Sequence, residues 1–551
     1  MAAPAPPSDV ARYFDYPQFT VPRAAELDGR CARHPVLVVG AGPVGLTSAL
    51  ALARAGVPVV VVDGKTTVSD GSRAICIARH SVETLHQLGV AERFLAKALP
   101  WTHGTSFYRG EAVFRLEMPH TAHDGFLPMY NLQQQYIELY LAEAAAAEPL
   151  IELRWGHRVD SLVCASDGVH LGIESPQGRY AMAARWVVAA DGARSRVRHA
   201  LGLALAGASY EGRYVIVDVH LRSSYPTERR AYFDPPANPG ATVLVHKQPD
   251  DIWRIDYQLG ADEDDEAALA EDAIRARVGA IIDMLGEPGP WTLVWRSLYK
   301  AYMLCLDDYR HGPVLFAGDA AHLVPIFGVR GLNSGFADAA NLAWKLALVI
   351  TGRAPECLLD SYSPERRGAT QDIFAQAGRS TRFMTPQSRG QRLVRDAALA
   401  LARRHAFVRR LLDPRQSAPY SYVDSGLTTA DPAGCEMPGP VPGSALLNAR
   451  LAAGDSLLDR IDVGFTLLVL DDGGIVFDLA ELVRHAAARG VDLRIIALDP
   501  RVEAGVCERY GARAGSAWLV RPDRHVCARW PALDVAAACR AFDRAMGRAA
   551  A

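Results

Sequence analysis

The sequence lacks the features that mark several classes of protein. None of its apolar runs is long enough to cross a bilayer, so we expect no membrane-spanning segment in these 551 residues. The 59 basic and 62 acidic residues balance to a net charge of −3, which gives no electrostatic case for nucleic acid or an anionic membrane surface. The nine cysteines are scattered and form no CxxC pair. We therefore expect no disulfide framework, no metal site and a reducing, cytoplasmic location.

What the sequence does contain begins with a glycine-rich turn in residues 36–45, VLVVGAGPVG. The apolar run predicts a buried parallel strand, the glycines a tight turn that admits a pyrophosphate, and the following residues a helix. A second apolar run, residues 57–62, ends in an acid suited to an adenosine ribose. This order indicates a nucleotide site, and a chance glycine turn is the alternative. The predicted contacts are Gly40, Gly42, Pro43, Val44, Gly45, Asp63 and Gly64.

Two later strands also end in an acid next to a glycine. Residues 185–190 lead into Asp191-Gly192 and a basic helix start, which favours a second nucleotide contact over a plain left-handed turn. Residues 314–317 lead into Gly318-Asp319, a glycine-rich loop and a helix predicted over 336–350. Asp319 at a strand end suits a ribose or ribitol hydroxyl, and a helix cap is the alternative.

Composition divides the chain into domains. Residues 212–260 alternate between apolar and polar types, which predicts an antiparallel sheet inserted into the α/β domain. A Pro/Gly-rich linker precedes a small α/β pattern, with strands at 465–470, 493–498 and 517–521 and a helix at 479–488. We predict an N-terminal arm (1–33), a nucleotide-binding domain with a helical extension (34–210 and 300–430), an inserted sheet domain (211–299), a linker (431–442) and a C-terminal domain (443–551).

The N-terminal arm is rich in Ala and Pro and then in aromatic residues, with Tyr13, Phe14, Tyr16 and Phe19. We expect it to wrap a neighbouring surface, either of its own chain or of a partner. A disordered tail is the alternative. The arm and the C-terminal domain together suggest a homodimer.

Three motifs resemble those of the flavin-dependent aromatic hydroxylases, the group A monooxygenases built like p-hydroxybenzoate hydroxylase. They are GAGPVG at 40–45, ADGARSRVR at 190–198 and GDAAHLVPIFGVRGLNSG at 318–335. The C-terminal extension is similar to the phenol hydroxylase and 3-(3-hydroxyphenyl)propionate hydroxylase branch, whose last domain is thioredoxin-like without redox cysteines. The resemblance implies an α/β FAD-binding domain of Rossmann type (GR2), an inserted antiparallel β-sheet that binds substrate, and a thioredoxin-like α/β domain.

The resemblance also implies FAD and its contacts. Arg73 matches an arginine that contacts the FAD phosphates and can meet the nicotinamide cofactor, with an exposed loop arginine as the alternative. Gln134 matches a flavin-contacting glutamine, and Asp319 matches the ribitol-binding acid. Leu332 and Asn333 match residues whose amides face the flavin N1 and C2 carbonyl. The remaining predicted FAD contacts are Asp191, Gly318 and Gly331.

By the same resemblance, NADH or NADPH reduces FAD, and O2 then forms a flavin C4a-hydroperoxide that hydroxylates a phenolic ring. A helix start at Leu332 would stabilise the negative charge of reduced flavin, and Arg330 would add to that effect. Arg330 stands where many members have lysine or glutamine. The Pro325 carbonyl would steer hydroxyl transfer, but Ile326 follows where the family often has a second proline.

We expect substrate contacts on the inserted sheet, from His220, Tyr232, His246, Arg254, Tyr257 and Tyr302. We select His246, Arg254 and Tyr257 among them as catalytic, although each is also compatible with a structural role. A carboxylated substrate would favour Arg254. The alternatives are the same flavin chemistry on a polycyclic polyketide (hydroxylation, epoxidation or Baeyer–Villiger oxygenation), a halogenase, whose tryptophan motif is absent, and a flavin-binding scaffold without turnover.

Overall fold

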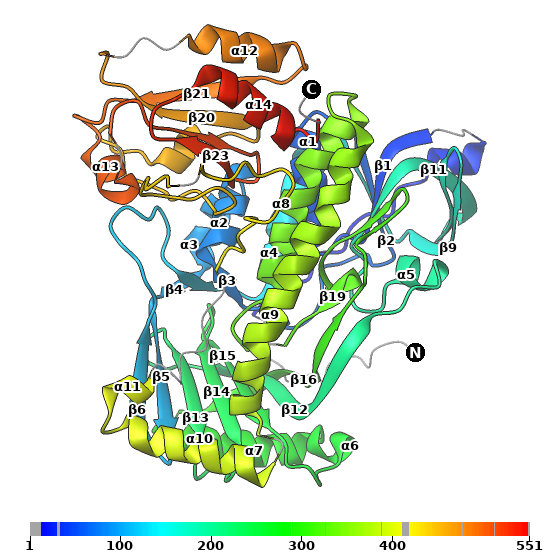
Figure 1. Cartoon of the computed structure of the whole chain (residues 1–551). Coiled ribbons are helices and arrows are strands. Elements are labelled where there is room, and N and C mark those ends of the chain that lie inside the picture. The colour runs from blue at the N-terminus through cyan, green and yellow to red at the C-terminus, as the bar shows by residue number, and fades with distance from the viewer. Residues whose placement is uncertain are drawn as a thin grey trace.

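The computed structural model describes residues 13–29, 33–287, 289–325, 327–386, 388–409, 418–432, 434–474, 478–511 and 513–548, without the side chains of residues 210 and 211. Two long helices, α8 (Gly331–Ile350) and α9 (Tyr362–Met384), run through the centre of the molecule (Figure 1). Around them lie a nucleotide-binding region, a large sheet at the bottom of the view and a C-terminal α/β region at the top left.

The nucleotide-binding region is built on a mainly parallel sheet in the order β17-β18-β11-β1-β2-β8. Its strands are β1 (Arg33–Val39), β2 (Val59–Asp63), β8 (Ile151–Trp155), β11 (Gly178–Ala189), β17 (Arg310–His311) and β18 (Val314–Phe316). An antiparallel extension from β9 (Arg158–Ala165) and β10 (Gly168–Ser175) joins β11. The apolar runs of the sequence therefore form central strands that are buried, as parallel strands require.

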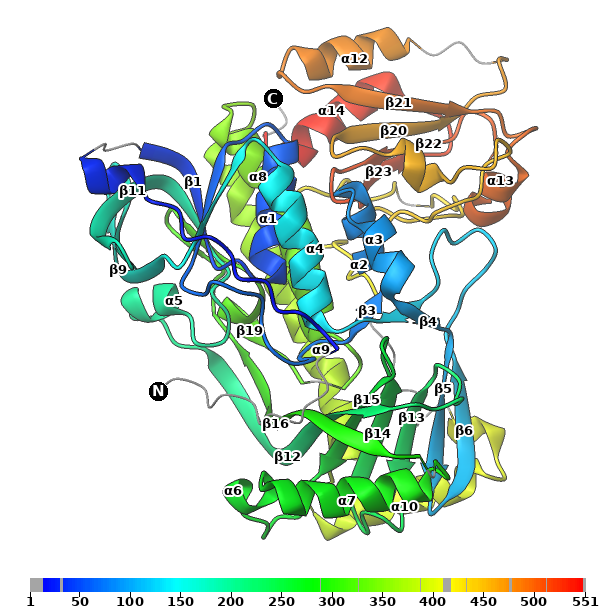
Figure 2. The same ribbon diagram turned by 180° about the vertical axis from the view of Figure 1, so that it is seen from behind.

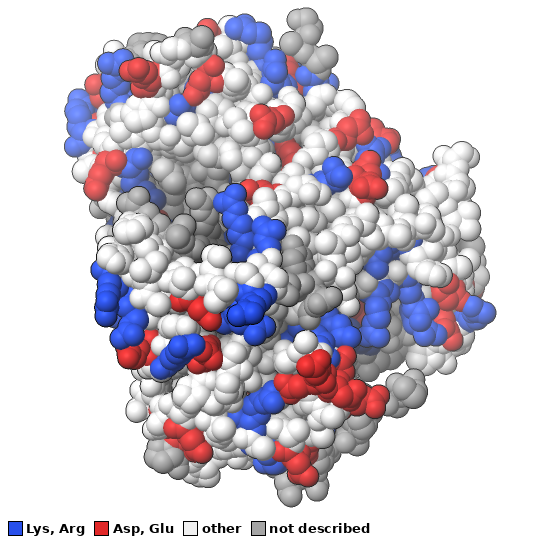
Figure 3. All heavy atoms as spheres, turned by 60° about the horizontal axis from the view of Figure 1, so that its bottom comes forward, with Lys and Arg blue, Asp and Glu red and all other residues white. Residues whose placement is uncertain are grey.

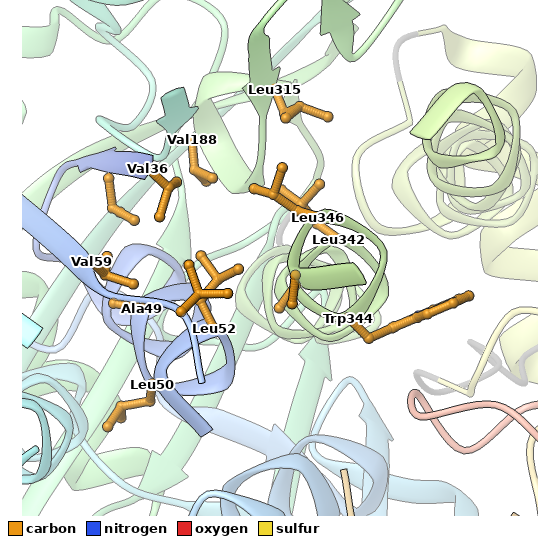
Figure 4. Close-up of a cluster of buried hydrophobic side chains, with 14 of the residues drawn as sticks. Val36, Ala49, Leu50, Leu52, Val59, Val188, Leu315, Leu342, Trp344 and Leu346 are labelled. Carbon is orange, nitrogen blue, oxygen red and sulfur yellow. The ribbon is translucent and has the colours of Figure 1, made fainter. Parts of the chain in front are cut away.

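Three helices, α1 (Pro43–Arg54), α4 (Gln134–Ala147) and α8, pack side by side against this sheet (Figure 2). Strand residues such as Val36 and Val188 meet Leu52 of α1 and Leu342 of α8 in one core (Figure 4). Trp344 points to the opposite side of α8, where its ring lies 5.6 Å from Phe465 of the C-terminal region. Helix α8 is thus apolar on two sides because it is buried between two regions.

A small sheet, β3-β7-β4, connects this region to the large sheet. Its strands are β3 (Cys76–Ala78), β4 (Leu99–Trp101) and β7 (Met129–Asn131). The helices α2 (Arg79–Gln87), α3 (Ala91–Lys97) and α5 (Arg196–Ala200) complete the region.

The large sheet has the order β19-β16-β12-β15-β14-β13-β5-β6. Its strands are β5 (His103–Tyr108), β6 (Glu111–Glu117), β12 (Ala206–Leu221), β13 (Arg229–Phe233), β14 (Thr242–Lys247), β15 (Ile252–Gln258), β16 (Trp291–Cys305) and β19 (His322–Leu323). The sheet is wider than the predicted insertion of residues 211–299. The strand pairs inside that insertion are all antiparallel, as predicted. The sheet as a whole is mixed, because β13 pairs in parallel with β5, which lies outside the predicted insertion.

Helices cover both faces of the large sheet. On one face α7 (Glu271–Met284) and the short α6 (Asp265–Ala268) follow the acidic segment of the sequence. On the other face, α10 (Arg389–Ala402) and α11 (Ala406–Arg409) follow the end of α9 (Figure 1). The valines of β12 and β14 form a separate apolar core with Ile255 of β15 and the apolar face of α7.

The C-terminal region has a four-stranded sheet in the order β21-β20-β22-β23. Its elements are η4 (Leu457–Arg460), β20 (Phe465–Leu470), β21 (Leu493–Leu498), β22 (Ala517–Val520), β23 (Val526–Trp530), α12 (Leu479–Ala487), α13 (Ala504–Tyr510) and α14 (Val535–Ala545). The three predicted strands and the predicted helix lie where the sequence placed them, within one residue. The sequence interpretation did not include β23, α13 and α14.

The described part of the N-terminal arm wraps its own chain. Phe14 is buried and packs edge-on against Tyr136, with ring centroids 4.8 Å apart. Phe19 stacks on Trp155 at 4.3 Å, and the arm then forms η1 (Ala25–Asp28). Residues 1–12 and 30–32 lie outside the described residues.

Charge is mixed over the surface. Figure 3 shows acidic and basic side chains side by side on the face that it presents, in keeping with the near balance of the sequence. Within the described part of the chain, no helix is both long and apolar enough to cross a bilayer.

Candidate functional site

The glycine turn of the first motif is tight at both ends and open in the middle. Gly40 has φ = 104°, and a Cβ added there would lie 2.5 Å from the Ala190 carbonyl oxygen. A Cβ on Gly45 would lie 1.9 Å from the Gly40 oxygen. Gly42, the N-cap of α1, has no atom within 4 Å of its added Cβ, and Pro43 begins the helix. The turn therefore leaves room for an anion at the positive end of α1.

Asp63 closes the same turn from the end of β2. Its carboxylate accepts hydrogen bonds from the Ala41 amide at 2.8 Å and from the Lys65 amide at 2.8 Å. The side chain stays partly exposed, so it retains acceptor capacity for a hydroxyl. The neighbouring Gly64 packs against Arg158, whose Cβ would lie 3.2 Å from an added methyl group.

The third motif (residues 318–335) packs against the first (residues 40–45), because two of its glycines lie against the Val44 side chain. A Cβ on Gly318 would lie 3.0 Å from the Val44 side chain, and one on Gly335 would lie 2.5 Å from it. Helix α8 begins at Gly331, five residues before the predicted start at residue 336. The reason is that Gly335 serves a close helix–helix approach and is not part of a loop.

The second motif (residues 190–198) is hydrogen-bonded to the third (residues 318–335). Asp191 accepts hydrogen bonds from the amides of Arg196 at 2.7 Å and Val197 at 3.1 Å, while burial raises its pKa above its ordinary value. Arg198 donates to the carbonyl oxygens of Ala320 at 3.0 Å and Ala193 at 2.6 Å. The sequence interpretation singled out Asp191 and missed Arg198, whose basic type gave no sign of this bridge.

Asp319 lies in the short helix η2 (Gly318–Ala320) with an accessible carboxylate. Among the described residues nothing donates a hydrogen bond to it. The surrounding protein displaces water from the carboxylate and so raises its pKa, although the charges of His322 and Arg73 oppose that shift. Arg73 is an exposed loop residue 3.5 Å from Asp70. The structure therefore brings Asp319 and Arg73, both predicted FAD contacts, close enough for their charges to interact.

A buried acid that the sequence interpretation missed holds the Asp319 loop in place. Asp338 accepts hydrogen bonds from the Gly318 amide at 3.0 Å, His322 Nε2 at 2.7 Å and Arg366 Nε at 2.7 Å. Burial alone would raise its pKa, but the charges of His322 and Arg366 outweigh burial and lower it to about 2. The sequence did offer one sign of this role: Asp338 is an acid within a mainly apolar helix, and a buried charge needs partners.

The start of α8 presents unpaired donors. Ser334 makes the first helical bond, to the Arg330 oxygen at 2.8 Å, and no described group accepts from the amides of Gly331, Leu332 or Asn333. These amides therefore favour a negative charge in front of the helix. Just before them, Val329 has φ = 60°, a strained conformation for a β-branched residue and a mark of functional loops.

The Asn333 side chain has a structural role that its amide does not share. It accepts hydrogen bonds from the Ala78 amide at 2.9 Å and Ser81 Oγ at 2.7 Å, and it donates to the oxygens of Cys76 at 3.1 Å and Val329 at 2.8 Å. The side chain thus ties α8 to the small sheet. Its backbone amide, which the resemblance assigns to the flavin, stays available.

Arg330 and Pro325 are both buried beside this helix start. The Arg330 guanidinium donates to Gln376 at 3.3 Å, and burial lowers its pKa although Asp372 opposes the shift. The predicted departure at Ile326 lies outside the described residues. Phe327 is fully buried, with its ring 5.4 Å from that of Tyr214 on the large sheet.

Gln134 stabilises the loop that carries Arg73. It begins α4, accepts a hydrogen bond from the Ala74 amide at 3.1 Å and donates to Glu138 at 2.6 Å. Glu138 in turn accepts from the Ser69 amide at 2.6 Å.

Two of the three selected sheet residues face this loop and one does not. Arg254 donates to Asp256 at 2.8 Å and to the carbonyl oxygens of Ser72 and Arg73 at 2.6 and 2.9 Å. His246 Nδ1 lies 3.9 Å from Cys76 Sγ, and burial together with nearby arginines lowers its pKa. Tyr257 lies on the opposite face, in the core formed with α7. The structure therefore brings Arg254 and His246 to the predicted site and leaves Tyr257 away from it.

Comparisons with known proteins agree on one family. Residues 33–377 match the model of a family described as "FAD binding domain". The chain is 28% identical over 519 residues to the 3-(3-hydroxy-phenyl)propionate/3-hydroxycinnamic acid hydroxylase of Mycobacterium sp. (strain JLS), covering 89% of this chain and 88% of that protein.

Solved structures give the same result. The flavin-dependent monooxygenase PieE in complex with FAD and substrate is 26% identical, with a TM-score of 0.77 over 94% of this chain and 99% of that one. Aklavinone-11 hydroxylase with FAD and aklavinone is 26% identical, with a TM-score of 0.73 over 94% of this chain and 100% of that one.

The residues of this chain fit FAD. The open turn at Gly42, the partly exposed carboxylate of Asp63, the accessible carboxylate of Asp319 and the first amides of α8 are groups that suit the phosphates and hydroxyls of an extended dinucleotide. The chain therefore belongs to the FAD binding domain family and is an FAD-dependent monooxygenase.

Proposed function

We propose that this monooxygenase hydroxylates a phenolic aromatic compound, with NADH or NADPH and O2 as co-substrates. Bound FAD supplies the redox chemistry, and the chain supplies binding, orientation and electrostatics. The hydroxylase named for 3-(3-hydroxy-phenyl)propionate, which aligns over most of both chains, supports this class of substrate.

In this proposal the glycine turn and Asp63 hold the adenosine end of FAD, and Arg73 contacts the phosphates. Asp319 accepts from a ribitol hydroxyl. The amides of Leu332 and Asn333 stabilise negative charge on the flavin ring, as aligned donors at a helix start do. The Pro325 carbonyl and Arg330 lie on the loop that precedes those amides, so they complete the ring end of the site.

One observation carries the proposal. The start of α8 meets the large sheet at Cys76, on the face of the sheet that carries His246 and Arg254. The Cys76 oxygen accepts from Asn333 of α8, and its thiol lies 3.9 Å from His246 of the sheet. An aromatic substrate held on that face of the sheet would lie next to the ring end of FAD. Burial raises the Cys76 thiol pKa to about 12 and lowers that of His246, so both groups stay neutral near pH 7.

The test uses the purified holoenzyme with a panel of phenols and phenolic acids. We expect one of them to accelerate NADH or NADPH oxidation and to yield a product carrying one oxygen atom from 18O2. Oxidation that no aromatic compound stimulates, or that yields hydrogen peroxide alone, would contradict the proposal and favour a scaffold without turnover.

A second candidate is the same chemistry on a larger, polycyclic substrate such as a polyketide. The similarity to aklavinone-11 hydroxylase in complex with aklavinone, over 94% of this chain, favours it. Stimulation by polycyclic phenols and not by single-ring ones would select this candidate. A homodimer and a cytoplasmic location stay predictions from the sequence.

A further inference from the structure

One row of charged side chains crosses the large sheet on the face that meets the FAD-binding loops. Strand pairing places His246 opposite Arg254 and Arg254 opposite Asp218. The register that pairs Arg230 with Val245 continues one step to place Arg229 opposite His246. Because alternate residues of a strand share a face, these four side chains form one row across β13, β14, β15 and β12. We name it the basic row: Arg229, His246, Arg254 and Asp218.

Two members of the basic row already have partners in the chain. Arg254 donates to Asp256 and to two carbonyl oxygens of the loop at residues 72–73. Asp218 accepts from Ser72 Oγ at 2.6 Å. The Arg254 guanidinium therefore holds the loop that carries Arg73. Its donors are already occupied, so it is less suited than a free guanidinium to the substrate carboxylate that the sequence suggested for it.

Arg229 differs from Arg254 in having no such partner. Its Nε is buried without a hydrogen bond, and among the described residues no carboxylate or carbonyl group accepts from its guanidinium. Burial lowers its pKa although Cys76 and Asp256 oppose the shift, and Asp256 is paired with Arg254 at 2.8 Å. Arg229 is half-buried with its Nε enclosed by protein. A cation that is partly withdrawn from water without a partner is costly, so the position favours an anion supplied from outside the chain.

The neighbourhood of Arg229 sets the kind of anion. Strand register places Arg229 opposite His246, whose Nδ1 lies 3.9 Å from Cys76 Sγ, and the Cys76 oxygen accepts a hydrogen bond from Asn333 of α8. Arg229 therefore lies beside the point where the sheet meets α8. Its charge adds to the effect of burial in lowering the pKa of His246, and it opposes the effect of burial on the pKa of Cys76. The next row on the same face contains Ala231, Leu244 and Ile216, all apolar, beside Asp256. A ligand that fits both rows has an anionic end and an apolar body.

We propose that Arg229 is a specificity-determining residue that binds the carboxylate of an aromatic acid substrate. This inference rests on the proposed function and narrows it from phenols to phenolic acids. A guanidinium matches a carboxylate through two parallel hydrogen bonds, which fixes the direction of the substrate as well as its charge. The carboxylate of the substrate would replace the missing partner of Arg229, while its ring would lie on the apolar row.

The experiment compares 3-(3-hydroxyphenyl)propionate with its neutral amide in the wild-type holoenzyme and in Arg229→Gln. Binding is read from the perturbation of flavin absorbance, and turnover from stimulated NADH or NADPH oxidation. We expect the wild type to bind the acid more tightly than the amide, and Arg229→Gln to weaken acid binding roughly 10- to 100-fold while changing amide binding little. Arg229→Lys keeps the charge without the paired geometry and should fall between the two.

Arg230→Gln is the matched control, because it removes the adjacent arginine, which points to the other face of β13 and pairs with Glu228. It should leave the ratio of acid to amide binding at the wild-type value. FAD content reports whether each variant folds, and Arg229→Lys preserves the test if Arg229→Gln does not. Equal wild-type binding of acid and amide, or an equal loss of both in Arg229→Gln, would overturn the proposal.

An increased KM for NADPH with every substrate would overturn it as well, because Arg229 would then serve the nicotinamide cofactor. A wild type that hydroxylates neutral phenols, with no preference for acids, would contradict this inference and leave the proposed function intact. A wild type that binds the acid through Arg229 but incorporates no oxygen from O2 would contradict the proposed function and leave the binding site intact.

Discussion

Two buried polar regions of this molecule differ in whether their charges find partners within the chain. The first, which we name the closed cluster, joins α8, α9 and the C-terminal region through Asn341, Lys345, Glu365, Arg521 and Asp523. Arg521 donates to both oxygens of Glu365, at 2.7 and 2.9 Å, and to Asp523 at 3.0 Å. Lys345 lies 2.7 Å from Glu365. The second region is the basic row, in which no described carboxylate or carbonyl group accepts a hydrogen bond from Arg229.

The difference separates structure from function. In the closed cluster every side chain is hydrogen-bonded within the chain, so the cluster fixes the C-terminal region against α8. Burying those charges is costly, and their specific pairing makes one docking geometry favourable. In the basic row a charge is left for a ligand. Buried polar groups thus indicate a binding site where their partners are incomplete.

The largest expected effect comes from opening the closed cluster. Arg521→Met removes the cation between two buried acids, so we expect a loss of about 3–5 kcal/mol in the free energy of unfolding of the holoenzyme. Guanidinium chloride denaturation measures it. Arg23→Ala, which breaks the exposed pair with Asp28, is the control and should cause no measurable change. A loss in Arg521→Met as small as that of the control would mean that the cluster does not dock the C-terminal region.

A pH dependence distinguishes the one acid of the basic row. Burial raises the pKa of Asp218 to about 6, although Arg254 and Ser72 oppose the shift. The folded protein therefore holds a proton that the unfolded chain releases near pH 4, and stability falls as the pH rises from 4 to 6. Relative to Asp218→Asn, the wild type should lose about 2 kcal/mol between pH 4 and 6 and show a constant difference above about pH 7. Parallel stability curves for the two proteins between pH 4 and 6 would contradict this expectation.

Asp319 and Asp338 allow the same contrast within one loop. Asp338 is fully used by the chain, whereas Asp319 has an accessible carboxylate without a described donor. We expect Asp319→Asn to weaken FAD binding roughly 10- to 100-fold and to leave the stability of the FAD-free protein nearly unchanged. FAD titration after removal of the cofactor measures the first effect, and thermal unfolding measures the second. Asp307→Asn, a highly exposed acid nearby in sequence, is the control. Normal FAD affinity in Asp319→Asn would mean that Asp319 does not contact the cofactor.

The sequence predicted the elements of the nucleotide-binding region because short-range contacts and runs of apolar residues determine them. Gly40 and Gly45 are required by backbone contacts a few residues away or across one strand pair. Apolar runs such as residues 465–470 likewise become buried strands wherever they occur. The family motifs extended this reading to FAD, which the comparisons confirm.

The sequence could not predict which polar residues of the large sheet are satisfied. Arg229 and Arg254 look alike along the chain, and only strand register and the arrival of the loop at residues 72–73 separate them. Arg198 and Asp338 were missed for the same reason, since their partners lie far away in sequence. Face assignment also depends on register, because a shift of one residue moves a side chain to the other side of a sheet.

Tyr257 gives the smallest expected effect and the sharpest test of face assignment. It was selected with His246 and Arg254, but its ring is buried on the α7 face, with the Arg277 guanidinium 5.3 Å from the ring centre. Tyr257→Phe keeps that ring and removes only the hydroxyl, so we expect a stability change under about 1 kcal/mol. Since the hydroxyl lies across the sheet from the basic row, kcat and the acid-to-amide ratio should stay within about twofold of wild type, a change of about 0.4 kcal/mol. Both are measured in the assay used for Arg229→Gln. A tenfold loss of kcat with unchanged FAD content would mean that the α7 face takes part in the reaction, and the division of this sheet into a structural face and a substrate face would fail.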